Sequence, residues 1–162
     1  MWRRSVLPLL ISLVLSACSS GGTDDPVTTV SSPVARGALE IAVEPNPIVA
    51  TNRDGDTYDF PFTVRIRETG GANVEIDEVR MDLIAFGALN VYSEKFGRDD
   101  IVKRGYQTLI ASNSEVRYSF KPRKEVPDDR LFGQVSAELT AEGRDANGNP
   151  VRATARVTLR RE

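Results

Sequence analysis

The chain has 162 residues, of which 40% are hydrophobic and 27% charged, a composition that suits one globular domain with appended segments rather than two full domains. Its 21 basic and 23 acidic residues give a formal net charge of -2, which argues against nucleic-acid binding through neutralised phosphates. With no histidine and one cysteine, the chain excludes imidazole acid–base relays, Cys–His nucleophile pairs, His/Cys zinc sites and intramolecular disulfides.

The N-terminal segment carries the most specific motif of the chain. Arg3 and Arg4 precede an almost unbroken apolar run from Val6 to Leu15. A membrane-spanning helix needs about 20 apolar residues, and this run has the shorter length of a signal-peptide core. The run leads into Leu15-Ser16-Ala17-Cys18. The segment resembles the signal of bacterial lipoproteins, whose lipobox places small residues before an invariant cysteine.

The resemblance implies a membrane anchor at Cys18. In that family the residues before the cysteine, here 1–17, are removed, the thiol receives a diacylglyceryl group and the new amino terminus is acylated. Two or three acyl chains, at about 0.8 kcal/mol per buried methylene, give stable anchoring. Ser19 follows the cysteine where inner-membrane lipoproteins of Gram-negative bacteria tend to have aspartate, which favours the outer membrane. The alternatives are an ordinary secretory signal or a buried core helix.

Residues 18–36 are expected to hold the lipidated cysteine and a disordered tether, because residues 19–36 are rich in Ser, Thr, Gly and Pro and contain no aromatic residue. The folded domain is therefore expected to cover residues 37–162.

Apolar residues in this domain recur with period two, and no window has a sustained 3.6-residue stripe, so we predict an all-β fold. The first strand covers Leu39–Val43 and ends at Pro45-Asn46-Pro47. The second covers Tyr58–Ile66. Within it, Pro61 cannot donate to a ladder and should face an edge or a bulge.

After a turn at Gly70-Gly71, a third strand begins, and its apolar phase changes between Ile76 and Val79. This change predicts a β-bulge near Asp77-Glu78. Residues 86–112 contain short apolar groups broken by glycine and aspartate, which indicate one or two short strands.

Three further strands are predicted in the C-terminal half: Val116–Phe120, Val135–Ala141 and Val151–Leu159. The segment Pro122–Arg130 is expected to form a charged loop. Seven or so strands in about 125 residues indicate a two-sheet antiparallel β-sandwich. This strand pattern resembles immunoglobulin-like or fibronectin III-like domains of bacterial surface lipoproteins, and the resemblance covers Leu39 to Arg160.

The turn Asp145-Ala146-Asn147-Gly148 predicts the register of the closing hairpin, because it has the residue preferences of a type I turn followed by a left-handed residue. The pairs expected on the outer face are Glu142 with Arg152, Thr140 with Thr154 and Glu138 with Arg156. Those expected on the inner face are Ala141 with Ala153 and Val135 with Leu159.

Carboxylates are the main candidates for acid–base chemistry in this chain. Asp99-Asp100 and Asp128-Asp129 are adjacent in sequence and would point in opposite directions on a strand, so neither forms a natural catalytic pair. We therefore predict no catalytic residue. A small hydrolase using loop carboxylates is the least favoured function.

A calcium candidate is the segment 54–59, in which Asp54, Asp56 and Asp59 offer oxygen ligands as in a fragment of a calcium loop, but the later bidentate Glu of an EF-hand is missing. The favoured interpretation is a polar turn. An Ig-like strand order would bring this turn to the same end as Asp128 and Asp129, so five carboxylates would gather there. The cations expected to neutralise them without a metal are Lys121, Arg123, Lys124 and Arg130.

Two surfaces are weaker binding candidates. A basic stripe of Arg65, Arg67, Arg117 and Lys121 could dock an anionic glycan or a lipid headgroup, although pairing with Glu40 and Glu44 as a solvated lattice is favoured. The aromatic residues Tyr92, Phe96 and Tyr106 could form a carbohydrate platform, although core packing is favoured.

The sequence thus predicts a lipid-anchored bacterial envelope protein with a non-enzymatic binding or structural module. The alternative is a glycan- or calcium-binding surface lipoprotein. We expect no cofactor and no nucleic acid, the membrane as a partner through Cys18, and an envelope protein or glycan as a second partner.

Overall fold

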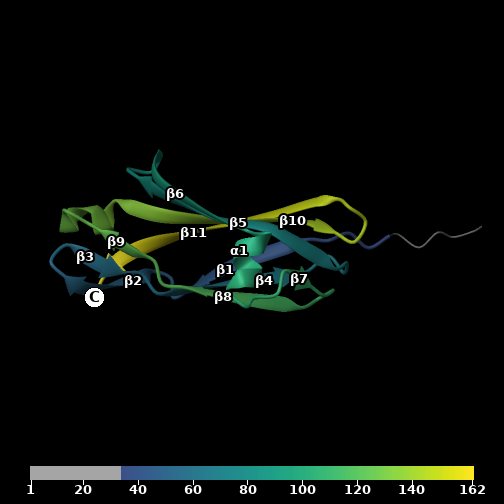
Figure 1. The fold of residues 1–162 in the computed structure, drawn as a ribbon. Helices are drawn as coiled ribbons and strands as arrows, with labels where there is room; N and C mark the ends of the chain where they lie inside the picture. The colour runs from purple at the N-terminus through teal and green to yellow at the C-terminus, as the bar shows by residue number, and fades with distance from the viewer. Residues whose placement is uncertain (1–33) are drawn as a thin grey trace, which may run out of the picture. The chain divides into compact units, whose positions relative to one another are not determined.

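The computed structural model describes residues 34–162; the predicted signal peptide, Cys18 and most of the predicted tether lie outside the described residues. Residues 34–162 form an all-β domain of two packed sheets (Figure 1). The predicted all-β class with two packed sheets is therefore confirmed, whereas the domain has eleven strands in place of the seven or so expected. No helix in this part of the chain is long and apolar enough to cross a membrane.

The smaller sheet has three antiparallel strands in the order β1-β4-β8. Its strands are β1 (Leu39–Glu44), β4 (Phe62–Glu68) and β8 (Glu115–Phe120). The larger sheet has the order β6-β5-β10-β11-β2-β3-β9. Its strands are β2 (Ile48–Asp54), β3 (Thr57–Asp59), β5 (Val74–Ala85), β6 (Leu89–Gly97), β9 (Arg123–Glu125), β10 (Val135–Asp145) and β11 (Pro150–Arg161), with β7 (Leu109–Ile110) paired to β5.

Prolines lie at the first two of the places where the chain changes sheet. Pro45 and Pro47 separate β1 from β2, a strand that the sequence analysis missed. Because β2 continues in the direction of β1, it pairs parallel with β11, which corrects the expectation of antiparallel pairing throughout. The predicted strand Tyr58–Ile66 is likewise two strands, β3 and β4, divided at Phe60 and Pro61.

Two local predictions are confirmed by the strand registers. In β5, Ile76 lies opposite Gly143 and Glu78 opposite Glu142, so that Asp77 is the extra residue of the predicted bulge. In the β10–β11 hairpin, Gly148 has φ of 80°, and its N–H donates to the Asp145 carbonyl at 2.8 Å. The predicted pairs Glu138–Arg156, Thr140–Thr154, Ala141–Ala153 and Glu142–Arg152 are all observed.

The region 86–134 departs most from the sequence analysis. Instead of one or two short strands it contains the nine-residue strand β6, the helix α1 (Arg98–Lys103) and the short strand β7. The predicted loop Pro122–Arg130 contains β9 and the start of a 3-10 helix, η1 (Asp129–Gly133). Apart from β6, these elements are too short, or too charged, to show a periodic pattern, and most side chains of β6 are exposed or only partly buried.

The hydrophobic core lies between the two sheets. Among its most deeply buried side chains are Ile48, Ile66, Ile76, Tyr118 and Leu139, each at most 1% exposed. The core cluster is drawn from residues 43–159, so the described domain contains a hydrophobic core of its own.

The domain has two chemically different ends. At the hairpin end, the β10–β11 turn lies beside the start of the described chain, where Asn147 Nδ2 donates to the Ala35 carbonyl at 2.9 Å (Figure 1). At the opposite end, the β5–β6 turn meets the segment after η1, and Phe86 N donates to the Gln134 carbonyl at 2.9 Å. We call this the pocket end, because an apolar pocket lies there. The strand β10 runs from one end to the other over 11 residues, about 36 Å.

Candidate binding site: an apolar pocket in a nearly closed sheet

The two edges of the larger sheet, β6 and β9, approach each other. Lys124 Nζ on β9 donates to the Tyr92 hydroxyl on β6 at 2.6 Å and lies 3.9 Å from the centroid of the Tyr92 ring. Tyr92 in turn donates to Glu94 Oε2 at 2.9 Å. Side chains therefore join the two edges where the strand order gives them no ladder. We call this gap between β6 and β9 the seam.

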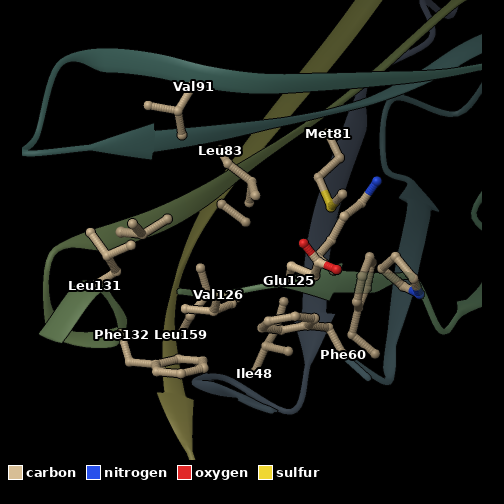
Figure 2. A pocket seen from close by; sticks show the side chains of 15 residues that line it. Ile48, Phe60, Met81, Leu83, Val91, Glu125, Val126, Leu131, Phe132 and Leu159 are labelled. Atoms are coloured by element: carbon tan, nitrogen blue, oxygen red, sulfur yellow. The ribbon is translucent and has the colours of Figure 1, made fainter. Parts of the chain in front are cut away.

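Behind the seam lies an apolar pocket of about 160 Å³ (Figure 2). An engineered cavity of about 150 Å³ in another protein is large enough to bind benzene. The lining side chains come from both sides of the seam and from the core. They are Ile48, Phe60, Phe62, Met81, Leu83, Val91, Pro122, Lys124, Glu125, Val126, Leu131, Phe132, Val135, Ala137 and Leu159. The pocket thus offers an almost wholly apolar interior with two charged groups at its rim.

Several elements hold the pocket open. Ala137 on β10 is fully buried and contributes only a methyl group to the wall. Phe132 in η1 packs edge-on against Tyr58 with ring centroids 5.0 Å apart. Asp128 caps η1 by accepting a hydrogen bond from Arg130 N at 2.9 Å. The wall formed by η1 is therefore fixed by both packing and capping.

The mouth of the pocket is shaped by a β-bulge. Leu83 lies opposite Tyr92 and Ile84 opposite Asn90, which leaves Val91 as the extra residue of β6. Bulges re-aim side chains at functional sites, and Val91 both lines the pocket and is 52% exposed. Figure 2 shows Val91 and Leu83 on the opposite side of the pocket from Val126 and Phe132.

Exposed apolar side chains continue from the mouth onto the β5–β6 turn. Leu89 is 59% exposed and Phe86 is 69% exposed. Phe86 also has a positive φ of 51°, which is uncommon for a bulky residue. Exposed apolar groups gathered at one place indicate an interaction surface.

A second hollow, of about 110 Å³, adjoins the pocket. The two share Phe62, Met81 and Pro122 in their walls, so they are neighbours, and we refer to them together as the groove along the seam. The second hollow also contains Phe96 and Arg104, whose guanidinium lies 4.9 Å from the Phe96 ring centroid.

The calcium candidates are not brought together. Asp59 is 2% exposed, and its Oδ1 accepts from Arg123 Nε at 2.9 Å. Its Oδ2 forms ion pairs with Arg53 at 2.8 Å and Lys121 at 3.3 Å, without a directed hydrogen bond. The hydrogen bond from Arg123 is the main reason that the pKa of Asp59 is lowered. Asp54 is exposed, and within residues 34–162 no three acidic side chains are placed to hold a metal ion.

The remaining carboxylates line a polar cleft at the pocket end. Asp56, Asp128 and Asp129 lie there, at one end of the domain as expected from the strand order. Arg130 contacts Asp128 at 2.7 Å, and Arg161 pairs with Asp129. The neutralising cations therefore include Arg53, which directly precedes Asp54, and Arg161, which is 32 residues from Asp129; the sequence analysis named neither. Lys124 does not neutralise this cluster, because its ammonium group contacts Tyr92 at the seam.

The basic stripe is a surface lattice on the smaller sheet. Arg65 contacts Glu44 at 3.6 Å and Glu115 at 3.7 Å, and Arg117 contacts Glu115 at 2.9 Å. Lys121 does not belong to it, since it pairs with the buried Asp59. Such exposed pairs add little to stability.

The three aromatic residues do not form a common platform. Each is half-buried against a different partner: Tyr92 against Lys124, Phe96 against Phe120 at 4.9 Å, and Tyr106 against Tyr118 at 5.2 Å. Asp99 and Asp100 lie in the first turn of α1 and are exposed.

Sequence reasoning missed the pocket itself. Its walls come from segments separated by up to about a hundred residues, and their apolar side chains look like ordinary core residues in sequence. The one available signal was the apolar Leu89 and Val91 in a segment otherwise rich in polar residues.

Comparison with known proteins shows the fold alone. No family model and no curated protein matches the chain. Among solved structures, the putative ApaA protein from Bordetella pertussis is 19% identical, with a TM-score of 0.55, over 78% of this chain and 98% of that chain. The structural genomics target SoR45 is 12% identical, with a TM-score of 0.51, over 75% of this chain and 86% of that chain. The domain is thus similar in fold to β-rich proteins of other sequence.

Proposed function

We propose that this chain is a lipid-anchored protein of the bacterial cell envelope whose immunoglobulin-like domain is a non-enzymatic binding module. In this proposal Cys18 carries the acyl chains, Ser19 directs the protein to the outer membrane of a Gram-negative cell, and the pocket behind the seam takes up an apolar group of the ligand. The observation that carries the binding function is the open apolar pocket with exposed apolar residues at its mouth.

The energetic cost of the pocket supports this proposal. Unfilled core volume costs about 24 cal/mol per Å³, so a space of about 160 Å³ forgoes up to ~4 kcal/mol of stability. A larger residue in place of Ala137 would recover part of that free energy. Empty apolar space with an exposed apolar rim is the arrangement expected of a ligand-binding site.

The position of the pocket also fits an anchored protein. The described chain begins at the hairpin end, and the pocket lies at the opposite end of β10. The place where the N-terminal segment joins the described domain and the pocket therefore lie at opposite ends of that domain. In the polar cleft, Asp128 and Asp129 are paired with arginines, which argues against acid–base catalysis by these two residues.

The anchor is tested by mass spectrometry of the protein extracted from membranes. We expect a chain that begins at Cys18 and carries acyl groups, and Cys18→Ser should abolish both the acylation and the membrane fraction. A soluble product cleaved at another residue would refute the anchor while leaving the pocket untouched.

The binding function is tested with the chain from Ser19 onward and an uncharged fluorescent probe, N-phenyl-1-naphthylamine. Ala137→Leu fills the pocket from its floor and should reduce probe binding at least about tenfold. Ala146→Leu places the same added side chain on the exposed turn at the hairpin end and is the matched control. Equal binding by both variants and the parent chain would refute the pocket as the binding site.

A further inference from the structure

The two hollows of the groove along the seam differ in the residues that line them. At one end, the pocket is closed by Leu131 and Phe132 and has apolar walls. At the other end, the second hollow carries the guanidinium of Arg104 over Phe96. The charged residues that line the second hollow are Arg104, Lys121 and Glu94, so the cations outnumber the carboxylates there. A groove that is apolar at one end and carries this excess of positive charge at the other complements a linear amphiphile with an anionic head.

The contacts of Arg104 support this complementarity. No carboxylate of residues 34–162 forms an ion pair with Arg104, whereas the neighbouring Lys121 pairs with Asp59. Glu94 also lines the second hollow, but its Oε2 accepts the Tyr92 hydroxyl hydrogen bond. Arg104 is therefore the cation of the groove that an incoming anion can pair with most directly.

The bridge between Tyr92 and Lys124 lies between these two ends. Tyr92 belongs to the strand that supplies Val91 to the pocket and Glu94 and Phe96 to the second hollow, and Lys124 lines the pocket. The bridge is made by side chains and not by a backbone ladder, so the seam can open without breaking a ladder.

We infer that the groove binds a fatty acid, with the carboxylate at Arg104 and the alkyl chain passing beneath the Tyr92–Lys124 bridge into the pocket. This inference rests on the proposed binding function and names its ligand class. In this inference the alkyl chain runs from one hollow into the other past Phe62, Met81 and Pro122, which line both. The ion pair at Arg104 gives selectivity, and burial of the alkyl chain supplies affinity.

The inference is tested by calorimetric titration of the chain from Ser19 onward with dodecanoate and with dodecanol at pH 8, below the micellar concentration. The two ligands share the alkyl chain and differ in the head group. We expect dodecanoate to bind at least about tenfold more tightly, because a charge-assisted pair adds to the same apolar contact.

Variants separate the two parts of the ligand. Arg104→Met should abolish the preference for dodecanoate while leaving dodecanol binding unchanged, and Arg104→Lys should retain part of the preference. Arg67→Met removes an exposed cation from the smaller sheet and should change neither affinity. Ala137→Leu should lower the affinity for both ligands. Thermal unfolding of each variant confirms that it is folded.

The outcomes distinguish this inference from the proposed function. Equal binding of dodecanoate and dodecanol, both lost in Ala137→Leu, overturns the fatty-acid assignment and leaves the apolar pocket as a binding site for another apolar group, such as a side chain of a partner protein. Absence of binding by both ligands, together with no binding of the naphthylamine probe, overturns both. A dodecanoate preference that survives Arg104→Met overturns the assigned orientation.

Discussion

The two ends of the domain hold their carboxylates in different ways. At the hairpin end, Glu68 is fully buried and accepts backbone hydrogen bonds from Ala38, Gly70, Gly71 and Asn113 at 2.6 to 3.2 Å. At the pocket end, Asp59 is held by the long side chains of arginine and lysine. Backbone donors have no rotamer freedom to lose, whereas a long cationic side chain does.

Asp145 repeats the pattern of the hairpin end. Its carboxylate accepts from the backbone N–H groups of Gly37, Asn147 and Asn149 at 2.9 to 3.0 Å. Together Glu68 and Asp145 fasten residues 37 and 38, where the folded domain begins. At the hairpin end, buried carboxylates thus hold the start of the domain in place, whereas the pocket end contains an apolar pocket. The contacts that stabilise the start of the domain and the pocket proposed for binding therefore lie at opposite ends of the domain.

The largest expected effect comes from breaking the hairpin end at Glu68. Glu68→Ala leaves four backbone N–H donors without their acceptor and creates a cavity, so we expect a loss of about 4 kcal/mol in the free energy of unfolding. Urea denaturation of the chain from Ser19 onward measures it. Glu68→Gln keeps one acceptor oxygen and should lose less. A loss below about 1 kcal/mol for Glu68→Ala would contradict the stabilising role given to the four backbone hydrogen bonds of Glu68.

Acid should weaken the same end. Burial by itself would raise the pKa of Glu68, but its four backbone donors outweigh this effect and lower the pKa overall. Hydrogen bonds from Asn149, Gly37 and Asn147 lower the pKa of Asp145 strongly. Because both folded pKa values lie below the unfolded ones, near 4, this stability is complete above about pH 5 and is lost as the pH falls through the folded pKa values.

Denaturation midpoints between pH 7 and pH 2 test this dependence. In the double variant Glu68→Gln with Asp145→Asn, the acid-induced part of the loss should shrink, because two of the responsible carboxylates are gone. An unchanged pH profile in the double variant would show that the carboxylates of the pocket end dominate instead.

The turn of the hairpin end offers a smaller test. Gly148 has φ of 80° and no heavy atom within 4 Å of an added Cβ, so Gly148→Val introduces backbone strain without a clash. We expect a loss of about 1 to 2 kcal/mol. Ala146→Ser in the same turn should change stability little. Equal and negligible effects of the two substitutions would argue against a left-handed requirement at Gly148.

The smallest expected change in stability comes from the pocket end. Ala137→Leu adds apolar volume where space is available, so its unfolding free energy should stay within about 1 kcal/mol of the parent, even though it removes binding. A large destabilisation would mean that the pocket is not free to accept a side chain, and it would weaken the contrast between the two ends.

Local chemistry in the sequence determined the all-β class, the bulge at Asp77 and the register of the β10–β11 hairpin, because period-two patterning, phase shifts and turn residues act between near neighbours. It also indicated the break near Pro61, since proline cannot donate to a ladder, although it did not show that the strand changes sheet there.

Only the tertiary structure decided the seam and the pocket. The meeting of Tyr92 with Lys124, the capture of Asp59 by Arg53 and Arg123, and the space beside Ala137 depend on how the larger sheet curls until its edges approach each other. That curvature accumulates from the twist between all of its strands and is not encoded by any single segment. The charged three-residue strand β9 takes part in the seam because the curled sheet brings it opposite the edge strand β6.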